Sequence, residues 1–157
     1  MTVPPPDVEV TVDVAAPPDA VWALLADPTR MGELSPECRR VTWVGDVRDT
    51  VVGARFRGVN RRGPNVWATL SAYVEVVPGE RVAWESRFLG LPVSRWQYAI
   101  EPADGGTRVV ESWWDQRHAV VRILGPVARI SVNAKEHNRR GMAVTLGRIK
   151  ARLENVA

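Results

Sequence analysis

The sequence has little of the chemistry that builds metal and redox sites, with one cysteine and two histidines in 157 residues. The lone Cys38 excludes an internal disulfide and a zinc site made of several thiolates, and we expect it to be a small, buried, apolar residue. His118 and His137 stand far apart, with no pair of cysteines near either of them. We therefore expect no metal site and no cofactor.

Long apolar runs are also missing. No stretch approaches the roughly 20 apolar residues that a membrane-spanning helix needs, so no transmembrane segment is expected. The first six residues, MTVPPP, lack the basic start and the apolar stretch of a secretory signal. We therefore expect a cytoplasmic protein. The absence of a Gly-x-Gly-x-x-Gly sequence argues against a dinucleotide-binding loop.

The net charge of +3 is unevenly distributed. Residues 1–116 carry 12 basic and 16 acidic side chains, whereas residues 117–157 carry nine basic and two acidic ones. A basic end suits an acidic partner, a membrane surface or nucleic acid, but also the solvated face of a helix. Arg57, Arg61 and Arg62 lie on one expected hairpin rather than along a stripe, so we expect no nucleic-acid binding.

The order of apolar and polar residues predicts an α+β domain over residues 1–157. After an extended lead-in at 1–7, residues 8–14 alternate as a half-buried strand, a helix opens at 16–19, and residues 29–38 form a short second helix or turn. Six further strands end at turn-forming residues. They are expected at 39–45, 54–61, 66–77, 81–88, 94–101 and 107–116.

A helical pattern follows over residues 118–154, with Gly125-Pro126 expected to kink or divide it. Met142 begins an apolar stripe along this segment, and Asn138 falls on the same side. His137 lies about 140° from that stripe on a helical wheel, so we expect it on the outward, exposed side. His118 is placed near one end of any cavity beneath the helix.

Hairpin register predicts which side chains share a face of the sheet. A loop of residues 103–106 places Tyr98 opposite Glu111, and Trp96 opposite Trp113, on one side, which we take as the inner side. The same reasoning applied to the other hairpins adds further residues to this face, although the alternative face of residues 66–77 is also apolar. The added residues are Phe56, Asn60, Trp67, Tyr73 and Trp84.

One amphipathic helix is too little to fill the inner face of seven strands. Aromatic walls with a few isolated polar groups are typical of a small-molecule pocket, and the polar groups here are Glu111, Asn60 and Asn138. A carboxyl beside Tyr98 among aromatic rings should have a raised pKa, and it can serve as an acid or as a ligand anchor. A purely structural glutamate, hydrogen-bonded to Tyr98 or to an arginine, is the alternative.

At this point the chain resembles the START-like, or SRPBCC, superfamily, and in particular its bacterial polyketide cyclase/dehydrase and lipid-transport-like members. The resemblance covers about residues 8–154 and implies a helix-grip fold. In that fold a curved seven-stranded antiparallel sheet wraps around a long C-terminal helix, with two short helices after strand 1. The segments that carry it are 16–22 (APPDAVW), 35–37 (SPE), 52–58 (VGARFRG), 92–102, 106–113 (GTRVVESW) and 137–142 (HNRRGM).

The resemblance implies a cavity between sheet and helix for lipids, polyketides or other aromatic molecules, but it transfers no catalytic set. Our first hypothesis is a START-like carrier, monomeric or homodimeric, that binds a hydrophobic small molecule in this cavity, where Met142 also lies. The second is a polyketide aromatase/cyclase or dehydratase in which Glu111 and Tyr98 move protons. A third is a regulatory subunit that binds a partner protein.

A transient contact with a membrane surface is also expected. Apolar residues just after the last strand would form a lip at the entrance, with basic neighbours toward acidic lipid headgroups. These residues are Val120, Val121, Ile123, Leu124, Arg117, Arg122 and Arg129.

Overall fold

The computed structural model describes residues 2–118 and 133–155 of the chain. Its strands form one antiparallel sheet of seven in the order β1-β7-β6-β5-β4-β3-β2. The strand order follows the chain except that β1 closes against β7. The strands are β1 (Val8–Val14), β2 (Cys38–Val44), β3 (Arg55–Arg62), β4 (Asn65–Val77), β5 (Arg81–Phe88), β6 (Leu91–Ala103) and β7 (Gly106–Asp115).

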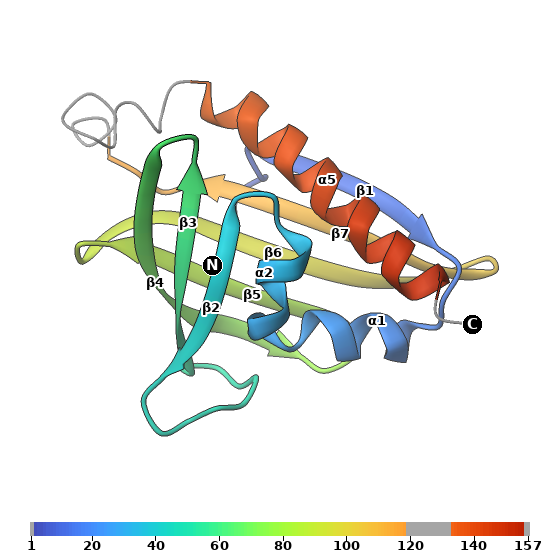
Figure 1. The fold of residues 1–157 in the computed structure, drawn as a ribbon. Coiled ribbons are helices and arrows are strands. Elements are labelled where there is room, and N and C mark those ends of the chain that lie inside the picture. The colour runs from blue at the N-terminus through green and yellow to red at the C-terminus, as the bar shows by residue number, and fades with distance from the viewer. Residues whose placement is uncertain (1, 119–132, 156–157) are drawn as a thin grey trace.

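Two short helices follow β1, and a long helix crosses the concave side of the sheet (Figure 1). The helices are α1 (Pro18–Leu25), the 3-10 turn η1 (Pro28–Arg30), α2 (Met31–Leu34) and α5 (Ala134–Glu154). This is the predicted α+β helix-grip architecture. No helix in the described part of the chain is both long and apolar enough to cross a bilayer.

The register of the last hairpin is as predicted. Tyr98 pairs with Glu111 and Trp96 pairs with Trp113. The connection is shorter than the expected four-residue loop, because residues 103 and 106 still pair and only two residues turn. Both loop lengths give the same register, so the inner face follows either way.

The inner face of β4 and β5 is the one that carries Tyr73 and Trp84, which pair with each other. On the opposite face, Leu70 and Val74 are 41% and 37% exposed. A bulge after Tyr73 shifts the pairing, so Val82 pairs with Val76 rather than with a residue of the aromatic row.

The apolar stripe of α5 packs as predicted, with Met142, Leu146 and Ile149 each at most 2% exposed. The helix begins at Ala134, after Asn133 in the left-handed region. Residue 118, the first of the expected helical segment, has no regular structure, and neither do residues 116 and 117 before it. The proposed Gly125-Pro126 kink lies outside the described residues. Within the sheet, α5 contacts mainly β1 and to a smaller extent β7.

Candidate functional site

A cavity of about 580 Å³ lies between the inner face of the sheet and the first turns of α5. All of the side chains that the sequence placed in a pocket line it. They are Phe56, Asn60, Trp67, Tyr73, Trp84, Trp96, Tyr98, Glu111, Trp113, Asn138 and Met142.

The volume exists because small residues occupy the middle of the inner face. Ser71, Ser86 and Ser94 stand in one row across β4, β5 and β6, and Gly58 on β3 pairs with Thr69, two residues before Ser71 on β4. The hydroxyls of Ser71 and Ser86 are buried and 2.7 Å apart, so each has a partner without water. Three hydroxymethyl groups and a glycine fill much less space than the aromatic rings around them, and they form the floor of the cavity.

Aromatic rings wall this floor in a continuous chain. Neighbouring rings lie between 5.0 and 6.4 Å apart, mostly tilted or edge to face. Such geometry is favourable for aromatic pairs and holds the walls in place without a ligand. The rings that line the cavity are Phe56, Tyr73, Trp84 and Tyr98, with Trp96 against Trp113 as a separate pair, and Trp43 packs on Phe56 and Tyr73 from outside the lining.

The lining includes a buried carboxyl, that of Glu111, which is 4% exposed. The hydroxyl of Tyr98 donates a hydrogen bond of 3.1 Å to its Oε1. The other oxygen, Oε2, is buried and has no partner among the residues that the structure describes. The cation expected as an alternative partner, an arginine, is not among its contacts, so Tyr98 alone orients this carboxyl within the described residues.

Burial raises the pKa of Glu111 to about 8, and the bond from Tyr98 offsets only part of that rise. Burial, together with the neighbouring Glu111, also raises the pKa of Tyr98 well above its usual value. At neutral pH the pair therefore consists of a carboxylic acid and a phenol, both uncharged. A neutral carboxyl among aromatic rings is able to donate a hydrogen bond to an oxygen of a bound molecule.

A family model described as polyketide cyclase/dehydrase and lipid transport matches residues 5–154 of the chain. The chain belongs to this family. No curated protein matches it. A member described as Polyketide_cyc-like protein Cgl2372, from Corynebacterium glutamicum, is 30% identical, with a TM-score of 0.62 and 98% of each chain covered.

Two more distant structures share the fold of the family. The di-domain ARO/CYC StfQ of the steffimycin biosynthetic pathway is 17% identical with a TM-score of 0.72 over 94% of this chain. This chain spans 50% of StfQ. TTHA0849 from Thermus thermophilus is 16% identical, with a TM-score of 0.73, covering 96% of this chain and 98% of its own.

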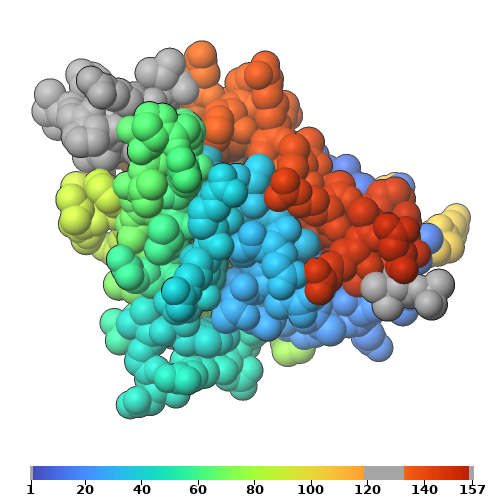
Figure 2. Space-filling model, in the orientation of Figure 1, coloured from blue at the N-terminus to red at the C-terminus, as the bar shows by residue number. Residues whose placement is uncertain are grey.

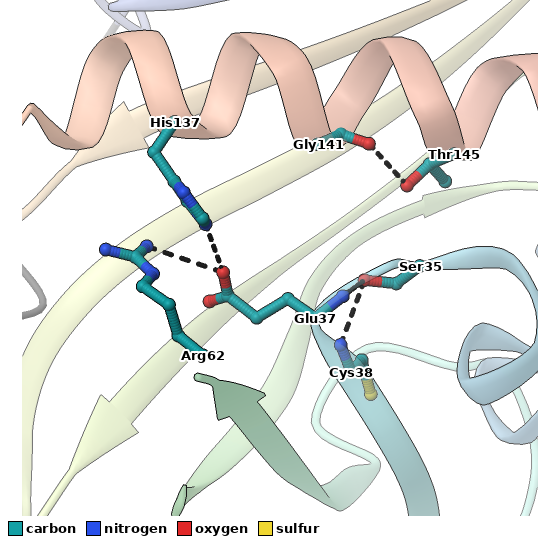
Figure 3. A network of polar contacts seen from close by, with 7 residues as sticks. All are labelled: Ser35, Glu37, Cys38, Arg62, His137, Gly141 and Thr145. Carbon is teal, nitrogen blue, oxygen red and sulfur yellow. Dashed lines mark hydrogen bonds and ion pairs between the residues drawn. The ribbon is translucent and has the colours of Figure 1, made fainter. Parts of the chain in front are cut away.

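At the rim of the cavity, a polar cluster joins three segments that are distant in the sequence (Figure 3). His137 Nε2 lies 2.5 Å from Glu37 Oε2, and Arg62 Nη2 lies 3.4 Å from the same oxygen. The hydroxyl of Ser35 accepts the backbone N–H groups of Glu37 and Cys38, which fixes the turn that presents Glu37. The cluster ties the start of α5 to the ends of β2 and β3.

The expectation that His137 lies on the outward side is wrong, since its side chain lines the cavity rim and contacts Glu37. The helical wheel placed the buried face against the sheet alone. The turn between α2 and β2 brings Glu37 against the first turn of α5, so a second face of the helix is also in contact. The sequence signal was Glu37, the acid directly after Ser35-Pro36, which we treated only as part of a family segment. His118 is exposed.

Cys38 is 8% exposed, as predicted, and it lines the cavity. Burial raises the pKa of its thiol to about 11. At neutral pH the folded protein therefore has a smaller fraction of thiolate than the unfolded chain, although each thiolate is more nucleophilic. From the pKa alone, we expect alkylation by iodoacetamide at neutral pH to be about tenfold slower in the folded protein. Timed mass spectrometry in buffer and in guanidinium measures both rates, and equal rates would contradict the burial of this thiol.

Proposed function

We propose that this protein binds and carries a hydrophobic small molecule, a lipid, polyketide or other polycyclic or aromatic compound, in the cavity between its sheet and α5. The observation that carries the proposal is a cavity of about 580 Å³ with aromatic walls and one buried carboxyl at its deep end. That volume lies within the range of small-molecule sites. Burial of the ligand's apolar surface would supply most of the affinity.

The deep end of the cavity favours a ligand with an oxygen on its apolar body. Because Glu111 is neutral at neutral pH, its free oxygen can carry a proton toward a carbonyl or hydroxyl group. A ligand bearing a carboxylate at this end would face a desolvated site with no cation among the described partners of Glu111 and Tyr98. Asn60 and Asn138 offer further amide groups nearer the mouth.

A carrier fits the site better than an enzyme because no base stands beside the acid among the described residues. Tyr98 has a raised pKa and stays a phenol, and His137 is held by Glu37 at the rim. The second candidate is a polyketide aromatase/cyclase or dehydratase. It is favoured by the protonated Glu111, which is in the state that a general acid needs, and by the likeness to StfQ.

The experiment is native mass spectrometry of the protein purified from its own host, combined with titration of the dye anilinonaphthalene sulfonate (ANS). We expect a copurified apolar molecule, and ANS fluorescence that this molecule displaces. A carrier would be supported if Glu111→Gln and Tyr98→Phe still bind the molecule and the molecule is released chemically unaltered. Loss of product formation from a poly-β-keto substrate, with ANS affinity intact, would establish the enzyme instead.

Such a carrier would act in the cytoplasm as one ligand-binding domain, monomeric or homodimeric, and would meet membranes briefly to exchange its ligand. The apolar lip that we expected for this contact, at residues 120–124, lies outside the described residues, as do Arg122 and Arg129. Arg117 lines the cavity mouth and forms an ion pair with Asp115.

A further inference from the structure

The turn between β5 and β6 carries an apolar residue where local chemistry disfavours one. Leu89 and Gly90 connect the paired residues Phe88 and Leu91, with φ angles of 49° and 79°. Two positive φ angles in a two-residue turn suit Asn-Gly, whereas a leucine is strained there. The side chain of Leu89 is also 85% exposed. A residue that costs stability and contacts little in its own fold indicates a contact with something else.

Neighbouring side chains extend this turn into a mixed basic and apolar surface. Leu91, which pairs with the cavity-lining Phe88 on the cavity side of the hairpin, is 48% exposed. On the outer side of β4, Val66 and Leu70 are 63% and 41% exposed. Arginines alternate with them across the strands, since Arg57 and Arg87 flank Leu70. We call this set the tip face. It comprises Leu89, Leu91, Val66 and Leu70, with Arg57, Arg61 and Arg87.

The charge of the tip face is not neutralised within the described chain. None of its three arginines forms an ion pair with a carboxylate in residues 2–118 and 133–155. Two of them bond to carbonyls of their own turns, Arg61 to Gly63 and Arg87 to Gly90. The arginines therefore keep N–H donors for an anionic partner, and guanidinium groups suit phosphate oxygens.

The tip face adjoins the cavity. Phe88, immediately before the turn, lines the cavity, and so does Trp67, the neighbour of Val66 on β4. Figure 2 shows the end of the β5–β6 hairpin, coloured yellow, beside the green β3–β4 hairpin at one edge of the molecule. An apolar molecule that entered the cavity at this edge would remain next to apolar side chains.

We propose that the tip face docks this protein on an anionic lipid bilayer, with Leu89 and Leu91 inserted among the lipids and the arginines on lipid phosphates. This rests on the proposed carrier function, because exchange at the bilayer spares an apolar ligand a passage through water. A bilayer fits the face better than a protein does. The apolar residues project from a turn and a strand surface, and the charge is of one sign.

The test is cosedimentation of the whole protein with vesicles of phosphatidylcholine alone, or of phosphatidylcholine with phosphatidylglycerol. Leu89→Asn should weaken binding to the anionic vesicles about tenfold, and Arg57→Gln or Arg87→Gln about fivefold each. Binding should be weak on neutral vesicles and should fall with added salt. Val52→Asn is the matched control, since Val52 is 63% exposed in the loop at the opposite end of the sheet, and it should bind like the parent protein.

Two readouts keep the docking proposal separate from the carrier proposal. Leu89→Asn relieves the turn, so its melting temperature should be unchanged or higher, and its ANS affinity in solution should be unchanged. A lower melting temperature would assign Leu89 a packing role and overturn the inference. So would unaltered vesicle binding, or a dimer in sedimentation velocity that Leu89→Asn dissociates. If the parent protein itself did not bind ANS, the proposed carrier function would be overturned instead.

Discussion

Replacing Glu111 by glutamine is expected to change the free energy of unfolding, relative to the parent protein, by a difference that rises with pH in favour of the variant. Burial raises the pKa of this carboxyl from 4.5 to about 8 in the folded protein. Between these values the unfolded chain loses its proton while the folded chain keeps it. The parent protein therefore loses stability as pH rises through this window. Glutamine cannot ionise, so the variant is spared that loss.

The size of the effect follows from the shift. A difference of several pKa units corresponds to roughly 5 kcal/mol at most, reached only above pH 8. The glutamine keeps an oxygen for the hydroxyl of Tyr98 but brings a buried amide, which costs about 1–3 kcal/mol if it stays unbonded. That cost is independent of pH, so it shifts the plot of the stability difference against pH without changing its slope.

Urea unfolding followed by tryptophan fluorescence at a series of pH values from 4 to 9 measures the difference between the two proteins. Glu80→Gln, an exposed glutamate at the turn between β4 and β5, controls for the loss of one negative charge. A difference between parent and Glu111→Gln that stays constant over the whole range would mean that Glu111 ionises normally in the folded protein.

This buried acid shows how far sequence reasoning reached into the site. Tyr98 and Glu111 were predicted to face each other because a hairpin register depends only on residues close in the chain. The same local reasoning placed Trp84 and Tyr73 on one face, with the other face of residues 66–77 left as an alternative, and in the structure the two residues pair. A bulge follows Tyr73 in β4. If the bulge lay one pair earlier along β4, the predicted face would be wrong, and nothing in the residue pattern marks the position of the bulge.

The features that the sequence did not predict depend on segments far apart in the chain. Glu37, Arg62 and His137 come from three different segments, and their meeting depends on how the turn before β2 is placed between the end of β3 and the first turn of α5. A helical wheel describes one helix in isolation and therefore placed His137 in solvent. The exposure of Leu89 was equally unpredicted, because its backbone angle and the direction of the turn are properties of the folded hairpin.

Filling the floor of the cavity should abolish ligand binding without harming the fold. Ser71 and Ser86 bond to each other, so the double variant Ser71→Ala, Ser86→Phe removes both partners and leaves no unpaired hydroxyl from the pair. A phenyl ring at position 86 would project from the middle of β5 into the cavity. It would lie between the cavity mouth and the row that holds Tyr73 and Trp84.

A ligand that loses the apolar contacts of this floor, or is displaced by the ring, should compete with ANS roughly a hundredfold more weakly. The free energy of unfolding should be equal or higher, since phenylalanine favours strands and fills empty space. Thr42→Phe, exposed on the outer face of β2, is the matched control and should leave ANS affinity unchanged. Unaltered ANS binding in the double variant, with the fold intact by circular dichroism, would place the dye outside the cavity and remove the main support for a carrier. The cavity floor is therefore the position where stability and binding are expected to move in opposite directions, which no merely structural role of the three serines would produce.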